Sequence, residues 1–510
     1  MLEIWRSGRR LSDGASEEFK KTIQRASQEK NLPTWNRTVR NTRSSQTYIT
    51  CLIDDLQWAL TNLGATTNTT IPMKDIETMA IFIHESQSGE DRGYHNVGRV
   101  FEVSAVASPI QVLAAFFRNT ISHFVDGELS PMQEELLENC FLPNTLQVNP
   151  QLYEDGILRM VAEIFGYEPG KDLEPLIYRW RHGMDVFLSA IVAVRFLSPL
   201  LSKKHIAELV ACLQGSIPFR ELVSNPDDKN LPPIEALYHR LSKVNEEHDL
   251  DFSDSELELC CQQAADLHNR FLGNFATTNP NTFLDYIWSL LPEQYHNLRR
   301  QYLYSLDDFY FAVFDMHNFM GKLRETVNYM SFHEVPPPSE INEFQKLFHK
   351  NYDMGTKYLK IRSTGIGIIV AIATLTGGAS VPKSFFFGDL RPHERAQTTS
   401  LGENLPKMTE LPLDCNVQLY EILREGRNTE CSFDQRNGPV AAYLYGALGD
   451  SGIDAAFQLC TYPMTEKDSW KILHSLPFDL VESIGHAVAS VAVPRATAVI
   501  DLLTKLSEST

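Results

Sequence analysis

Side chains that bind metal ions gather in one short stretch of the sequence, residues 83–127. Neutral imidazoles and anionic carboxylates that converge from separate helices can hold a divalent cation, which leaves open positions for a water and a substrate phosphate. Such a site hydrolyses phosphate esters. The residues of the stretch that would form or border it are His84, Glu85, His95, Arg118, Asn119, His123 and Asp126.

The order of these residues resembles the start of the HD superfamily of metal-dependent phosphohydrolases. The likeness covers residues 74–127, where a helix ends near His84, His95 stands between a tyrosine and an asparagine, and Pro109 opens an apolar helix. In that family, an early histidine in such a setting is followed by a His-Asp pair on the apolar helix. A weaker likeness at 265–275 is similar to the later helix that supplies a final aspartate. The resemblance implies an all-α domain built around a metal centre.

Three of the four matched ligand positions carry a side chain that does not suit a metal. His95 matches the early histidine, but Arg118 and Asn119 replace the His-Asp pair, and Phe271 stands at the position of the last aspartate. A guanidinium remains charged at any working pH. A +1 group about 5 Å from a +2 ion costs roughly 6–7 kcal/mol at an effective dielectric constant near 20. We therefore expect a vestigial site with no catalytic residue, no metal and no cofactor.

Two roles stay open for Arg118. Its guanidinium can close the old cavity by pairing with a carboxylate, or it can bind the phosphate of a ligand without hydrolysing it. The candidate carboxylates are Glu85, Asp126 and Glu128. Three histidines lie in the same stretch, His84, His95 and His123. Their simplest interpretation is as half-buried, hydrogen-bonded imidazoles, and a relocated metal site is the alternative.

Two other motifs match known sites in residue type or spacing but not in their sequence context. Ser380-x-x-Lys383 has the spacing of a serine β-lactamase motif, but a proline and a glycine-rich context disfavour a nucleophile on a helix. Gly365-x-Gly367 lacks the third glycine and the preceding strand of a dinucleotide-binding loop. Neither motif supports an enzymatic function.

Charge disfavours nucleic acid as the general partner. The chain has 510 residues and a formal charge of −19. Residues 1–50 hold ten Arg and Lys against five Asp and Glu, so this segment carries +5 and the remaining residues carry −24. We expect a basic arm that lies in solvent or against the acidic body, with phosphate contact as the alternative. The eight cysteines are scattered, which is typical of reduced thiols in a cytosol.

Apolar residues recur at helical spacing along most of the chain, which predicts an all-α, multidomain protein. The apolar stretches 186–201 and 366–376 are too short to cross a bilayer, so we expect buried helices there and no membrane span. The predicted parts are an N-terminal arm and small helical region at 1–72, an HD-like helical domain with insertions at 73–376, an extended linker at 377–414 and a C-terminal helical region at 415–510. Predicted helices lie at 73–85, from Pro109 onward, and at 131–141, 152–166, 173–197, 203–214, 232–247, 255–275, 281–292, 306–330, 340–363 and 480–506, the last split by Pro494.

The sequence favours a catalytically inactive, HD-like pseudoenzyme that acts by binding a protein or a ligand. It resembles the non-catalytic HD-like domains found among bacterial effectors that type IV secretion delivers. An active metal-dependent phosphohydrolase or phosphodiesterase with shifted ligands is the alternative. No apolar segment follows Met1, so we expect a cytoplasmic protein, with transfer into a host cell as the alternative.

Overall fold

The computed structural model describes residues 47–508, apart from 65–70, 90, 106, 141–147, 168–182, 219, 221–222, 225–229, 301–302, 324–328 and 389–399. Nearly all of the predicted basic arm at 1–50 lies outside the described residues, as does the first part of the predicted helix at 173–197.

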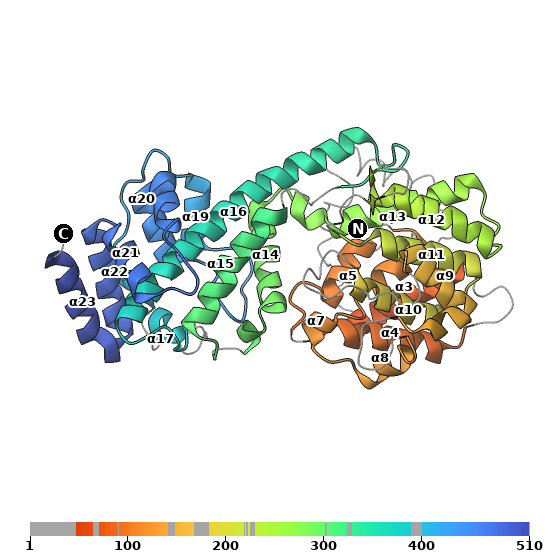
Figure 1. The fold of residues 1–510 in the computed structure, drawn as a ribbon, viewed down its shortest axis with the longest axis horizontal. Helices are drawn as coiled ribbons and strands as arrows, with labels where there is room; N and C mark the ends of the chain where they lie inside the picture. The colour runs from red at the N-terminus through yellow and green to blue at the C-terminus, as the bar shows by residue number, and fades with distance from the viewer. Residues whose placement is uncertain are drawn as a thin grey trace. The chain divides into compact units, whose positions relative to one another are not determined.

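The described chain is almost entirely helical, which confirms the predicted all-α fold (Figure 1). It divides into two compact units. Unit 1 comprises residues 1–278 and 325–348, and unit 2 comprises residues 279–324 and 349–510. The helices of unit 1 are α3 (Tyr48–Asn62), α4 (Met73–Gln87), α5 (Val97–Ser104), α6 (Pro109–Phe117), α7 (His123–Asp126), α8 (Pro131–Leu136), α9 (Gly156–Phe165), α10 (Met184–Leu197), α11 (Lys203–Gly215), α12 (Pro233–Glu247) and α13 (Asp254–Phe271), with short 3-10 helices η2 (Pro150–Glu154) and η3 (Gly273–Ala276).

Strands within the described residues are confined to one small antiparallel pair in unit 1. Strand β1 (Val223–Ser224) pairs with β2 (Asn230–Leu231), so that Val223 lies opposite Leu231. This pair joins α11 to α12 and leaves the helical class unchanged.

Helix α11 forms the centre of unit 1. It packs against α6, α9, α10, α12 and α13, and it is buried from Leu209 to Gly215. Gly215 is required here, because a Cβ at this position would lie 2.6 Å from the Cβ of Ala264 on α13. The close approach of α11 and α13 sets the position of Ser216, which follows directly in the chain.

Unit 2 contains the helices that follow residue 278, and α16 begins in unit 1 and continues into unit 2. The last two helices of unit 2 confirm the predicted split of the helix at 480–506, because Pro494 lies in a 3-10 turn between α22 and α23. The elements are α14 (Pro280–Gln294), η4 (His296–Arg299), α15 (Leu306–Leu323), α16 (Pro338–Leu375), α17 (Ser384–Phe387), η5 (Leu401–Asn404), α19 (Val417–Glu425), α20 (Pro439–Phe457), α21 (Glu466–His474), α22 (Phe478–Val491), η6 (Val493–Arg495) and α23 (Ala496–Glu508).

Helix α16 is longer than the sequence predicts. The sequence analysis predicted a helix at 340–363 and a separate buried helix at 366–376, whereas α16 runs through both glycines to Leu375 without a break. Gly365 lies against the backbone of Ala441, where an added Cβ would stand 3.1 Å from the Cα, and Gly367 lies against Tyr310. Tertiary packing therefore outweighs the low helix propensity of glycine.

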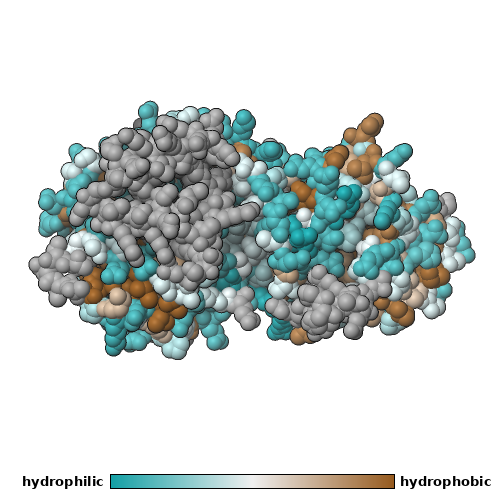
Figure 2. Space-filling model, turned by 180° about the vertical axis from the view of Figure 1, so that it is seen from behind, coloured by the Kyte–Doolittle hydropathy of each residue, from teal (hydrophilic) through white to brown (hydrophobic). Residues whose placement is uncertain are grey.

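By length and composition alone, α16 is apolar enough to cross a membrane. However, 83% of its most apolar 18-residue window is buried inside the protein. Figure 2 shows that hydrophilic residues cover most of the described surface on the face it draws, with hydrophobic residues in small groups. The apolar half of α16 thus serves as core packing in unit 2.

The two units divide the chain at other points than the predicted boundaries at 72, 376 and 414. The chain passes from unit 1 to unit 2 after residue 278, returns for 325–348, and leaves again. The predicted linker at 377–414 also contains helix α17 and η5 in its described part. A search for linkers cannot detect a segment that returns to an earlier unit, because nothing in its local composition marks the return.

Glu208 of α11 gives unit 1 a predicted pH dependence. Burial raises the pKa of Glu208 from 4.5 to about 7, an effect that Lys204 opposes and Glu256 reinforces. Between these two pKa values the folded state keeps the proton and the unfolded state loses it, so stability falls as the pH rises. We expect Glu208→Gln to raise the free energy of unfolding at about pH 8 by about 1–2 kcal/mol, after allowing for partial exposure, and to change little at about pH 4.

Urea unfolding at both pH values, followed by circular dichroism, measures this effect. The exposed Glu246→Gln on α12 is the matched control and should show no such pH dependence. An equal effect of Glu208→Gln at the two pH values would contradict the assignment.

Candidate functional site

The pair Arg118-Asn119 lies at the C-terminal end of α6. A capping box formed by Ser108 and Gln111 starts this helix, and Arg118 is its C-cap. Every residue from 110 to 117 is buried, so the chain reaches the end of α6 inside unit 1. Arg118 is 6% exposed and Asn119 is 8% exposed. The sequence analysis placed this pair on the apolar helix, whereas the helix ends at Phe117 and the pair follows it directly.

Every nitrogen of the Arg118 guanidinium donates to a neutral oxygen. Nε donates to Ser216 Oγ at 3.0 Å, Nη2 donates to the Ser216 carbonyl at 3.2 Å, and Nη1 donates to Asn119 Oδ1 at 2.7 Å. The guanidinium carbon lies 4.0 Å from the centre of the Phe271 ring, in cation–π contact. Arg118 therefore contacts both Asn119 and Phe271, and the sequence analysis matched these three residues to ligand positions.

The predicted ion pair of Arg118 is wrong. Among the described residues Arg118 makes no hydrogen bond or ion pair with a carboxylate: Glu85 and Glu128 are exposed, and Asp126 pairs with Arg92. Burial lowers the pKa of Arg118 to about 10, which still leaves it protonated at neutral pH. The positive charge in the core is balanced by aligned oxygens and an aromatic face.

Arg92 is a site residue that the sequence analysis missed. Its Nε and Nη2 donate to the two carboxylate oxygens of Asp126 at 2.7 and 2.6 Å, and its Nη1 donates to the Asn119 carbonyl at 3.0 Å. The Arg92 side chain is fully buried. Arg92 lies in a glycine-rich turn 34 residues from Asp126, and no periodic pattern relates the two.

A second arginine contacts the C-terminal end of α13 and the residues that follow it. Arg99 of α5 donates from Nη1 to Asn274 Oδ1 at 2.7 Å and from Nη2 to the Phe271 carbonyl at 3.0 Å. These bonds fix the C-terminal end of α13, and with it the ring on which Arg118 rests.

His84 and His95 do not join this cluster through a hydrogen bond to Arg118. His84 is half-buried at the end of α4 and lies 3.4 Å from Ser88 Oγ. His95 is half-buried, with its ring edge-on to that of Tyr94 at 4.8 Å between centres. His123 begins α7, and its side chain is outside the described atoms. In the described part of the chain no group of three His, Cys, Asp or Glu side chains is placed to hold a metal ion.

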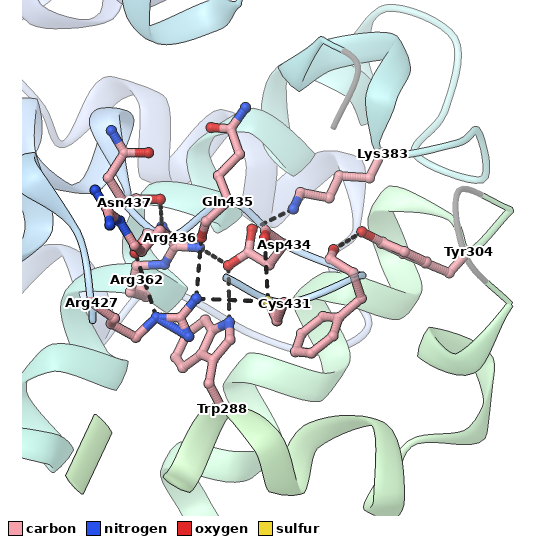
Figure 3. A network of polar contacts seen from close by, with 11 residues as sticks. Trp288, Tyr304, Arg362, Lys383, Arg427, Cys431, Asp434, Gln435, Arg436 and Asn437 are labelled. Atoms are coloured by element: carbon pink, nitrogen blue, oxygen red, sulfur yellow. Dashed lines mark hydrogen bonds and ion pairs between the residues drawn. The ribbon is translucent and has the colours of Figure 1, made fainter. Parts of the chain in front are cut away.

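Unit 2 contains a separate buried cluster around Asp434, shown in Figure 3. Asp434 is 2% exposed and accepts hydrogen bonds from Lys383 Nζ at 2.5 Å, Arg362 Nη2 at 2.6 Å and Trp288 Nε1 at 3.0 Å. Arg427 is also buried, and its guanidinium carbon lies 4.5 Å from the centre of the Trp288 ring. Three buried cations thus surround one buried carboxylate.

The pKa values in this cluster reflect that charge balance. Burial by itself raises the pKa of Asp434, but attraction to Arg362, Lys383 and Arg427 outweighs it and holds the pKa below its usual range. Burial lowers the pKa of Lys383, and Asp434 opposes this effect. The carboxylate therefore stays ionised in the core.

Lys383 belongs to the Ser380-x-x-Lys383 motif, which the sequence analysis set aside as a catalytic signature. The structure gives Lys383 another role, because its ammonium is 3% exposed and bound to Asp434. The two residues are 51 positions apart, and Arg362 and Asp434 are 72 apart. Pairs at such separations leave no local signal in the sequence.

The comparisons with known proteins supply no relative. A scan of protein-family models and searches of curated proteins and solved structures find no match for this chain.

The bidentate pair of Arg92 and Asp126 predicts a large loss of stability when it is broken. We expect Arg92→Ala to lower the free energy of unfolding by about 2–3 kcal/mol, because Asp126 and the Asn119 carbonyl lose buried donors. In the control, Arg159→Ala, the arginine side chain is 49% exposed in its pair with Glu163, and a much smaller loss is expected because solvent screens the pair. Urea titrations measure both. Equal losses in the two variants would contradict the importance of the buried pair.

Removal of the carboxylate in unit 2 should be more damaging. Asp434→Ala leaves three buried cations unpaired, and we expect a loss of about 3–5 kcal/mol. The control is Asp454→Ala, which removes the 57% exposed partner of Lys360 and should cost less than about 1 kcal/mol. Thermal unfolding of both variants checks this ranking, and a mild effect of Asp434→Ala would refute it.

Proposed function

We propose that this chain is a non-catalytic, HD-like helical protein that acts by binding a partner protein or a ligand. The single observation that supports the proposal most strongly is the packing of Arg118. At the position that matches the histidine of the His-Asp pair, a buried guanidinium lies on Phe271, the residue matched to the last aspartate, and donates to Ser216 and Asn119.

A metal site would need other side chains in this space, and other partners for the oxygens around it. Arg118 is protonated at neutral pH, and a divalent cation beside it would meet the repulsion estimated from its charge. Asn119 directs its carbonyl oxygen to Arg118, and Asp126 directs both carboxylate oxygens to Arg92. The Asn119 oxygen, at the position matched to the aspartate of the His-Asp pair, and both Asp126 carboxylate oxygens are thus already engaged with arginines.

Binding is the remaining role that suits such an arrangement. Unit 1 is a well-packed helical body whose old catalytic region has become part of the core, so its exposed faces are left for recognition. The excess of acidic residues favours a protein or small-molecule partner over nucleic acid. Cytoplasmic location and delivery into a host cell as an effector both stay predictions.

Metal analysis combined with an activity screen tests the proposal. The purified full chain, incubated with Mn²⁺, Mg²⁺, Fe²⁺ or Zn²⁺ and desalted, should hold less than stoichiometric metal. It should show no chelator-sensitive turnover of phosphomonoesters, phosphodiesters or nucleotides, because the matched ligand positions hold a cation, an amide and an aromatic ring.

The matched variant for this test is His95→Ala, which removes the one retained ligand position. Stoichiometric metal or turnover that both EDTA and His95→Ala abolish would overturn the proposal in favour of an active phosphohydrolase with shifted ligands. Metal binding at an exposed histidine would instead persist in His95→Ala and would leave turnover absent, as the proposal expects.

A further inference from the structure

Helix α20 of unit 2 begins with uncapped backbone donors. Its N-cap is Gly438, which has no side chain to cap the helix, and its first residue is Pro439, which has no N–H. The Gly438 N–H donates to the Leu423 carbonyl at 2.8 Å. Among the described residues, the N–H groups of Val440 and Ala441 have no hydrogen-bond acceptor. The positive end of the helix is therefore free to meet an anion.

A buried arginine with a spare donor stands at the same place. Arg362 is 5% exposed and lines a small cavity together with Gly438, Val440 and Ala441, and Asp434, the ion-pair partner of Arg362, lines it as well. Its Nη1 donates to the Asn437 carbonyl at 2.9 Å and its Nη2 to Asp434, but its Nε has no partner among the described residues. A buried donor without an acceptor is costly, so a ligand that supplies one is favoured.

The charge around the cavity also favours an anion. Arg362, Lys383 and Arg427 surround Asp434, and the next carboxylate that acts on this group is the part-buried Asp285, beside Arg427. One more positive than negative charge therefore remains. An anion would neutralise it in a region from which water is largely excluded.

The available space sets the size of the ligand. The cavity has a volume of about 10 Å³, enough for one oxygen-sized group. A cleft of about 770 Å³ adjoins it and shares Gln435, Asn437 and Pro439 as lining residues. A cleft of this size holds a small organic molecule. Tyr420 and Tyr443 line it and offer aromatic contacts. Its charged lining residues are three cations and three carboxylates, namely Lys407, Arg424, Arg436, Glu403, Glu425 and Glu430.

We infer that unit 2 binds a small phosphate-bearing molecule. One phosphate oxygen occupies the cavity, where it accepts from the α20 N-terminus and Arg362, and the body of the molecule lies in the adjoining cleft. The site is independent of Arg118 and of the proposed loss of catalysis in unit 1, so failure of one proposal does not decide the other.

Titration of the full chain with inorganic phosphate and with adenosine 5′-monophosphate tests the inference. Isothermal titration calorimetry, at ionic strength held constant with NaCl, should show saturable binding at one site per chain. The nucleotide should bind more tightly than inorganic phosphate, because its body fills the cleft. Absence of saturable binding of both probes, or equal affinities for the two, would overturn the inference.

Substitutions at Pro439 separate the site from general charge effects. Pro439→Glu places a carboxylate in the first turn of α20, which suits the helix dipole and should keep the fold, but it should weaken phosphate binding by about tenfold or more because like charges repel. Pro439→Gln is the neutral comparison, because it adds the same backbone N–H without the charge, and Pro439→Glu should bind at least about tenfold more weakly than Pro439→Gln. Unchanged affinity in Pro439→Glu, with circular dichroism showing a folded chain, would refute the site.

Arg362→Gln removes the buried guanidinium and should abolish binding. Because it also deprives Asp434 of a partner, its thermal unfolding is measured alongside, and the Pro439 pair decides the outcome if Arg362→Gln does not fold.

Discussion

Both units bury positively charged side chains, and the need to give each of them acceptors shapes the structure around it. In unit 1, Arg92 takes both oxygens of Asp126, and Arg118 takes neutral oxygens from Ser216 and Asn119. A desolvated guanidinium needs a well-placed acceptor for its N–H groups, because a buried donor without one costs as much free energy as several surface contacts contribute. The ends of α6 and α11 are therefore fixed relative to each other by hydrogen bonds as well as by apolar packing.

The two arginine clusters satisfy this requirement to different extents. Each nitrogen of Arg118 has an acceptor, so this cluster is complete without a ligand. Around Asp434, three cations share one carboxylate and the Nε of Arg362 has no acceptor in the described part of the chain. The same physical demand is thus met at Arg118 and left incomplete at Arg362.

The sequence predicted the features that depend on local pattern. Apolar spacing placed α4 and α13, and Pro494 split the last helix pair, because side-chain periodicity and missing donors act within one turn. It failed where distant segments decide. Gly365 stays helical because α16 presses on Ala441, and Lys383 lies in a segment predicted to be a linker but is buried against Asp434. The resemblance singled out Arg118, Asn119 and Phe271, whereas the Ser216 partner of Arg118 and the Asp126 partner of Arg92 could not be predicted, since they lie in separate elements.

The difference between the units has a thermodynamic consequence for how the chain responds to a ligand. A molecule that binds only the folded state stabilises whichever unit it contacts. An anion at Arg118 would have to displace existing hydrogen bonds to Ser216 or Asn119, whereas an anion at Arg362 would satisfy a donor that has no acceptor and reduce the excess of positive charge. Phosphate recognition through backbone N–H groups and a guanidinium also needs no metal and provides no activated water. Unit 2 is thus suited to hold a phosphate without cleaving it, and occupancy should protect unit 2 against unfolding more than unit 1.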